Sequence, residues 1–163
     1  MREWVQLLAL APHAELGLVD QIRQVSLGAK DWLRTRDPEN VSAFRVSTAA
    51  LLAEYALHPE RVELLQKVVR YHEKVLQLYP TNPNDRIRMS NILLMQYERT
   101  GDVRALKRAS RELATALDLN SRRDPDEVRR FSAEKVVELE TRLAKLKSRL
   151  ADDYPHGSEP ENP

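Results

Sequence analysis

The chain has no cysteine, only four glycines among 163 residues, and 6% aromatic residues. Without cysteine, disulfides and thiolate chemistry are excluded, although the compartment stays open. So few glycines leave little room for a glycine-rich phosphate-binding loop. The net charge of +1 provides no large field to attract nucleic acid. No apolar run approaches the roughly 18 residues that cross a bilayer, so we expect no direct membrane insertion by this chain.

What is present favours helix. Hydrophobic residues make up 42% and charged residues 31%, with leucine, alanine, glutamate, arginine and lysine prominent. Apolar positions recur at steps of three and four, and no segment alternates as a strand would. We expect one all-α domain over residues 1–151 and a disordered polar tail over 152–163. The expected helices are 2–11, 14–36, 41–57, 60–79, 84–100, 103–119 and 132–151.

The chain repeats with a period of 42 positions. Pro38 and Pro80 are one period apart and each precedes a polar pair, and Tyr55 and Tyr97, also one period apart, each end an apolar helical pattern. Proline cannot continue a helix, and Gly101 can take the left-handed conformation that closes one. The linkers are therefore short, which makes neighbouring helices antiparallel. Helix pairs in tandem form an α-solenoid, here with about three antiparallel pairs.

The last expected helix, 132–151, carries a narrow leucine-rich stripe, and Ser132 can cap its start. Such a stripe suits either a helix that caps the array or a coiled-coil seam. Because the stripe spans only about two heptads, which is short for an independent coiled coil, we expect a C-terminal capping helix.

The stretch "YHEKVLQLYPTNPNDRIRMSNILLMQYERTGD" (71–102) resembles the tetratricopeptide repeat (TPR). A helix ends before Tyr-Pro, a polar pair follows, and a new helix begins. Ala116 keeps the late alanine of the family, but the period of 42 exceeds the family's 34. The resemblance implies a TPR-like α-solenoid that binds a protein or peptide partner along the first helix of each pair.

Family positions place the partner-binding residues at Arg45, Asn84, Arg88 and Asn91. Ala49 and Ile87 stand where a carboxylate clamp needs polar groups, so that mode of recognition is not expected. The other reading of these polar residues is that they are merely solvated.

A second resemblance is narrower. The stretch 64–102, followed by "ELATALDLNSRRDPDEVRRFSAEKVVELETRLAKL" (112–146), resembles the soluble C-terminal repeat region of bacterial O-antigen ligase and polymerase-like membrane proteins. In that family a polytopic membrane portion transfers lipid-linked polysaccharide. The resemblance implies an extramembrane domain on the extracytoplasmic side of a bacterial membrane, with catalysis in a portion absent from this chain. If this second resemblance does not hold, a cytoplasmic location is expected.

No constellation in the sequence indicates an active site. The four histidines lack metal-like partners at helical spacing, and no nucleophile motif occurs. Arginines and acids cluster in 121–132, where a solvated connector with local ion pairs is favoured over a phosphate site. We therefore expect no catalytic residue, cofactor, metal or nucleic acid, and a non-catalytic interaction scaffold. The alternatives are a small-ligand-binding or enzymatic helical bundle, and a purely self-associating structural domain.

The first expected helix, 2–11, is apolar on nearly every side, with Trp4, Leu7 and Leu8 among its residues. Such a helix must be covered on more than one face, and a solenoid needs a polar outer face at its ends. An upstream repeat, a membrane portion or a second copy of the chain would cover it. For this chain we expect a homodimer through Trp4, Leu7 and Leu8.

Overall fold

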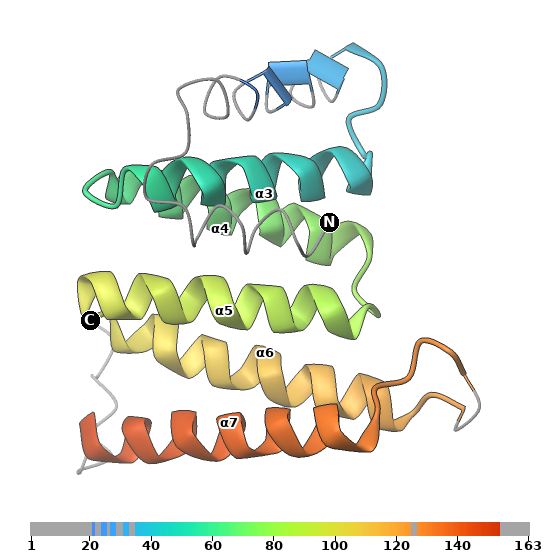
Figure 1. The fold of residues 1–163 in the computed structure, drawn as a ribbon, viewed down its shortest axis with the longest axis vertical. Coiled ribbons are helices and arrows are strands. Elements are labelled where there is room, and N and C mark those ends of the chain that lie inside the picture. The colour runs from blue at the N-terminus through green and yellow to red at the C-terminus, as the bar shows by residue number, and fades with distance from the viewer. Residues whose placement is uncertain are drawn as a thin grey trace, which may run out of the picture. The chain divides into compact units, whose positions relative to one another are not determined.

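A computed structural model describes residues 21–153, except 22–23, 26, 29–30, 33–34 and 125–126. The described residues contain helices and no strand, which confirms the all-α class (Figure 1). The helices are α3 (Val41–Leu57), α4 (Val62–Leu78), α5 (Pro83–Thr100), α6 (Val103–Ser121) and α7 (Ala133–Asp153). Within this part of the chain, no helix combines the length and apolar character that crossing a membrane requires.

The helix boundaries follow from their end residues. Asn40 and Asn82 precede α3 and α5, and their side-chain oxygens accept hydrogen bonds from the first helical turns, at 2.9 Å and 3.0 Å. Gly101 closes α5 with a φ of 70°, and Asp102 caps α6 by accepting a hydrogen bond from the Arg104 N–H at 2.9 Å. The breaks expected at these positions are confirmed.

The last helix differs from its expected limits. The Ser132 hydroxyl accepts a hydrogen bond from the Lys135 N–H, which gives α7 the expected start. The helix continues to Asp153, however, so residues 152–153 are helical and do not belong to the expected tail. Ala151, Asp152 and Asp153 contain neither proline nor glycine, so nothing stops the helix there. Residues 154–163 lie outside the described residues.

The chain divides into two compact units at Thr81–Asn82. In the first unit, α3 packs on α4. Leu51 of α3 and the residues Leu64, Leu65, Val68 and Val75 of α4 are buried. Phe44 and Tyr71 meet edge to face, with ring centroids 5.8 Å apart, across the two helices. Over 41–78 the first unit is therefore a helix pair joined through an apolar face.

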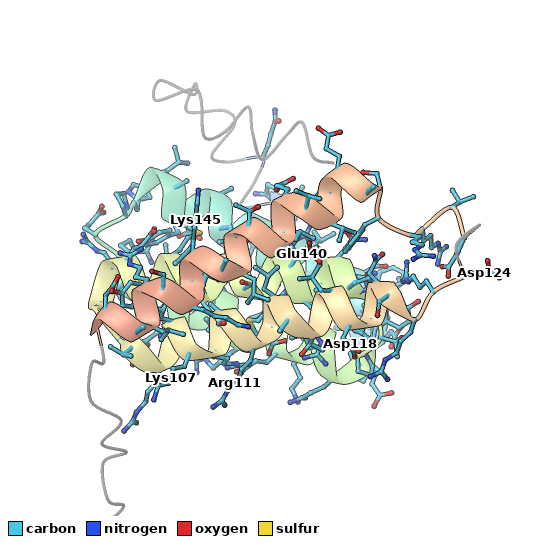
Figure 2. All side chains as sticks on the ribbon, turned by 90° about the horizontal axis from the view of Figure 1, so that it is seen from below. Lys107, Arg111, Asp118, Asp124, Glu140 and Lys145 are labelled. Atoms are coloured by element: carbon cyan, nitrogen blue, oxygen red, sulfur yellow. The ribbon has the colours of Figure 1, made fainter. Side chains whose placement is uncertain are left out.

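In the second unit, α6 packs against both α5 and α7 (Figures 1 and 2). Its core is a leucine cluster of Leu106, Leu113, Leu139 and Leu146. Leu143 and Leu150 pack against this cluster. The stripe of the last helix is thus covered by its own unit, which is the placement expected of a capping helix.

The two helix pairs have similar lengths and share most of their buried positions. The start of α5, Pro83, follows the start of α3, Val41, at the period found in the sequence. Val103, the start of α6, follows Val62, the start of α4, by one residue less than this period. The α3–α4 turn is two residues longer than the α5–α6 turn, whereas α5 is one residue longer than α3, which accounts for the difference. At these offsets, buried residues of one pair fall on buried residues of the other: Ala43/Asp85, Ser47/Met89, Thr48/Ser90, Ala50/Ile92, Leu51/Leu93, Leu64/Ala105, Leu65/Leu106, Val68/Ala109, His72/Leu113 and Val75/Ala116.

Candidate functional site

The first unit carries an arginine–tyrosine pair at its surface. The guanidinium carbon of Arg45 lies 5.6 Å from the centre of the Tyr79 ring, directly after the end of α4. Tyr79 is 42% exposed. This is a cation–π contact, and tyrosine and arginine are the residue types that most often anchor protein partners. The sequence pointed to Arg45 but not to Tyr79, although Tyr79 stands in the Tyr-Pro junction that carries the TPR resemblance.

In the second unit, Asn84 and Arg88 are exposed and lie one turn apart on α5. The backbone N–H of Asn84 donates to the cap residue Asn82, while its side chain lies at the surface. An amide and a guanidinium on one face can hydrogen-bond to a peptide backbone or a carboxylate. Both residues are exposed, and their role in partner binding stays a prediction.

Asn91 has a role that the sequence did not anticipate. Its side-chain oxygen accepts a hydrogen bond from the Arg142 guanidinium of α7. Ile87, one of the family's binding positions on α5, and Leu94 pack against the leucine cluster that α7 helps to form. The expectation of an open α5 face is therefore wrong over this part. The apolar pattern of α5 alone cannot show that α7, which comes much later in the sequence, packs against it.

A second arginine of α7 repeats this contact one heptad later. The Arg149 guanidinium lies 3.8 Å from the Glu98 carboxylate and 4.7 Å from the centre of the Tyr97 ring. Arg149 follows Glu98 at the same sequence distance as Arg142 follows Asn91, so α5 and α7 run parallel. Burial lowers the pKa of Arg142, and the charge of Glu138 acts in the opposite direction.

A carboxylate of α6, Glu112, contacts Arg86 of α5 and also Arg108 of its own helix. Glu112 Oε2 lies 2.7 Å from Arg86 Nη1, and Glu112 Oε1 lies 3.8 Å from Arg108 Nε. The Glu112 side chain is only 11% exposed. Because a carboxylate this well buried is costly without a cation, the two arginines compensate the charge of Glu112.

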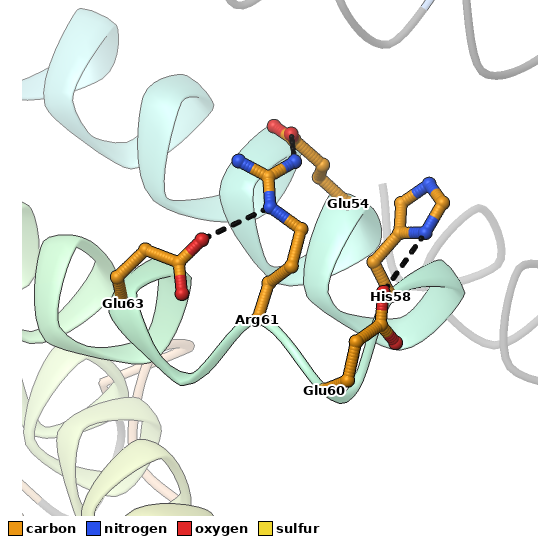
Figure 3. Close-up of polar contacts among 5 residues, drawn as sticks. All are labelled: Glu54, His58, Glu60, Arg61 and Glu63. Atoms are coloured by element: carbon orange, nitrogen blue, oxygen red, sulfur yellow. Dashed lines mark hydrogen bonds and ion pairs between the residues drawn. The ribbon is translucent and has the colours of Figure 1, made fainter.

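The α3–α4 turn holds a group of charged residues (Figure 3). The Arg61 guanidinium bridges Glu54 at 2.8 Å and Glu63 at 3.0 Å, and His58 Nδ1 lies 3.5 Å from Glu60. The pKa of Glu63 is lowered, first by a hydrogen bond from its own backbone N–H and then by Arg61. The hydrogen bond to Glu63 raises the pKa of Arg61. The group ties the start of α4 to the end of α3.

The connector between α6 and α7 contains the expected local ion pairs in its described part. Arg122 contacts Asp118 at 2.7 Å, and Arg123 contacts Glu127 at 3.6 Å. The side-chain oxygen of the buried Asn120 accepts a hydrogen bond from the Phe131 N–H at 2.8 Å, which fastens the end of this loop.

No set of three His, Asp or Glu side chains in the described residues is placed to hold a metal ion. Trp4, Leu7 and Leu8 lie outside the described residues, so self-association through them stays a prediction. The candidates for partner binding that these contacts leave are Arg45 with Tyr79 in the first unit, and Asn84 with Arg88 in the second. No protein-family model, curated protein or solved structure matches this chain, so its function has to be inferred from these residues themselves.

Proposed function

We propose that this protein is a non-catalytic protein–protein interaction scaffold built from TPR-like helix pairs. In this proposal 41–78 and 83–121 are successive units of an α-solenoid, and α7 caps the C-terminal end. The observation that carries the proposal is the match of buried positions between α3 and α5 and between α4 and α6. Units with the same inward positions also present the same outward positions, which is how solenoids form binding surfaces.

The proposed binding residues are those that the first helices keep at the surface. Arg45 with Tyr79 supplies a cation–π anchor in the first unit, and Asn84 with Arg88 supplies polar contacts in the second. Asn91 is excluded from the set because it binds Arg142. The residues of α5 proposed for binding are accordingly Asn84 and Arg88, whereas Asn91 and Glu98 contact α7.

The resemblance to O-antigen ligase-like proteins suggests where such a scaffold would work. We propose an extramembrane domain of a bacterial envelope polysaccharide system, on the extracytoplasmic side, with any catalysis in a membrane portion outside this chain. The supporting feature is the order of elements after Tyr79-Pro80: a helix pair, the polar connector 122–132, and the leucine-rich α7. A cytoplasmic scaffold is the alternative if that resemblance is fortuitous.

Site-specific photo-crosslinking in the native host tests the proposal. A photo-reactive residue replacing Arg88 should give a discrete adduct with one partner, identified by mass spectrometry. The same residue replacing Lys145, which is equally exposed but lies on α7, is the matched control and should not give that adduct. Arg45→Glu should weaken the adduct formed at position 88. Identical adducts from positions 88 and 145, or none at 88, would remove this face as the binding surface.

A further inference from the structure

The outward face of α6 is strongly basic. Residues 103–111 contain four cations and no carboxylate. Arg104, Lys107 and Arg111 are exposed and follow a spacing of three and four residues, which places them on one face. Figure 2 shows Lys107 and Arg111 projecting from the side of α6 that faces away from α7. These three residues are called the α6 basic stripe below.

The two carboxylates of α6 bind arginines outside the stripe. Glu112 is nearly buried and contacts Arg86 at 2.7 Å, and Asp118 contacts Arg122 at 2.7 Å. Both lie on the C-terminal side of the stripe. Residues 103–111 thus carry four formal positive charges and no carboxylate of their own, although the whole chain is close to neutral.

The chemistry of the stripe narrows the kind of anion that it fits. α6 contains no aromatic residue, so it offers no platform on which nucleic-acid bases can stack. Its leucines Leu106 and Leu113 are buried, and α6 has no large apolar side chain among the strongly exposed ones, so none is available for insertion into lipid. Two of the three cations are arginines, whose guanidinium forks match carboxylates.

The protein already contains one example of this recognition, since the Glu112 carboxylate is held by Arg86 and Arg108 beside the stripe. From Arg104 to Arg111 the stripe is about 10 Å long, which equals about three residues of an extended chain. We propose that the α6 basic stripe is a docking surface for an acidic polypeptide segment. The α6 basic stripe lies on the second helix of its pair. The binding surface proposed above lies on the first helices, so the two proposals are independent.

The test is fluorescence anisotropy with a labelled octaglutamate peptide as the probe, using the full chain at low salt. We expect saturable binding that weakens as salt rises from about 50 to about 500 mM, because exposed charges are then screened. Arg104→Glu/Lys107→Glu/Arg111→Glu should weaken binding at least about tenfold, because three attractive contacts become repulsive. All three residues are exposed and glutamate is a good helix former, so the variant should fold, and circular dichroism checks this.

The matched control is Lys67→Glu/Arg70→Glu/Lys74→Glu on α4, which has the same spacing and change in net charge at exposed positions, but whose cations share their turns with Glu63 and Glu73. This variant should change binding less than about threefold, because local contacts and not net charge carry the interaction. Equal losses in both variants, or no binding by the wild type, would overturn the proposal. So would binding to anionic phospholipid vesicles without binding to octaglutamate. If the α6 variant fails to fold, Arg104→Gln/Lys107→Gln/Arg111→Gln replaces it and should still lower the affinity.

Discussion

Arg142 of α7 donates a hydrogen bond to the side-chain oxygen of Asn91 in the middle of α5. The contact joins two helices that are separated by all of α6 and the connector. It converts Asn91, an expected partner-binding residue, into part of the interface that holds α7 in place. The partner surface proposed on α5 shrinks to Asn84 and Arg88 as a result.

This contact predicts a difference between two asparagines of the same helix. Asn91→Ala should destabilise the second unit by about 0.5–1.5 kcal/mol, because it removes the hydrogen bond that the Arg142 guanidinium donates from α7 to α5. Asn84→Ala, which removes no hydrogen bond between helices, should change stability by less than about 0.5 kcal/mol. Urea unfolding measures both. Equal effects of the two substitutions would show that the Arg142 contact contributes little.

The second prediction concerns the core position Leu93, which is 2% exposed. Leu93→Ala should cost about 2–5 kcal/mol, because it removes buried methyl groups and leaves a cavity. Leu27→Ala is the matched control, since Leu27 is 58% exposed, and should cost less than about 0.5 kcal/mol. A loss at Leu93 no larger than at Leu27 on denaturant melting would contradict the placement of Leu93 in the core.

The third prediction is a pH dependence at the α3–α4 turn. Because the folded state lowers the pKa of Glu63, its ionised form stabilises the fold at pH values above its ordinary pKa of 4.5. That contribution disappears as pH falls below 4.5 through the lowered value. Glu63→Gln should therefore reduce the loss of stability on acidification, measured by thermal melting from neutral to acidic pH. Arg61→Ala should reduce it only in part, since the backbone hydrogen bond to Glu63 remains. A Glu63→Gln variant with the wild-type pH profile would refute the assignment.

The fourth prediction concerns residues 2–11, whose apolar pattern predicts a helix that another surface must cover. Light scattering at tens of micromolar should show a dimer for the wild type, because the helix expected at 2–11 would present Trp4, Leu7 and Leu8 as an apolar surface that a second copy can bury. Trp4→Glu/Leu8→Glu should give a monomer. A monomeric wild type, or a variant that stays dimeric, would exclude self-association through this helix.

The ends of the helices were predictable because local chemistry sets them. Pro83 starts α5 and Gly101 ends it, and such residues act through their own backbone geometry. The contacts of Asn91 and Arg45 were not predictable, because they depend on Arg142 and Tyr79, which reach them only after the helices pack. A hydrophobic period shows which side of a helix is apolar, but not which later segment covers it.

The proposal that the two helix pairs are successive solenoid units has one direct test. Successive units place their first helices side by side and parallel, about 10 Å apart. Because the chain has no native cysteine, spin labels can be introduced as cysteine pairs at Ser42 and Asn84, and at Ala56 and Glu98, which are exposed and one repeat period apart.

Electron paramagnetic resonance then measures the distance within each labelled pair. Parallel neighbouring helices predict two narrow distributions with similar means, both shorter than about 25 Å, which is roughly the length of α3. Two means longer than a helix, clearly different means, or broad distributions for both pairs would contradict the solenoid and the scaffold function proposed for it.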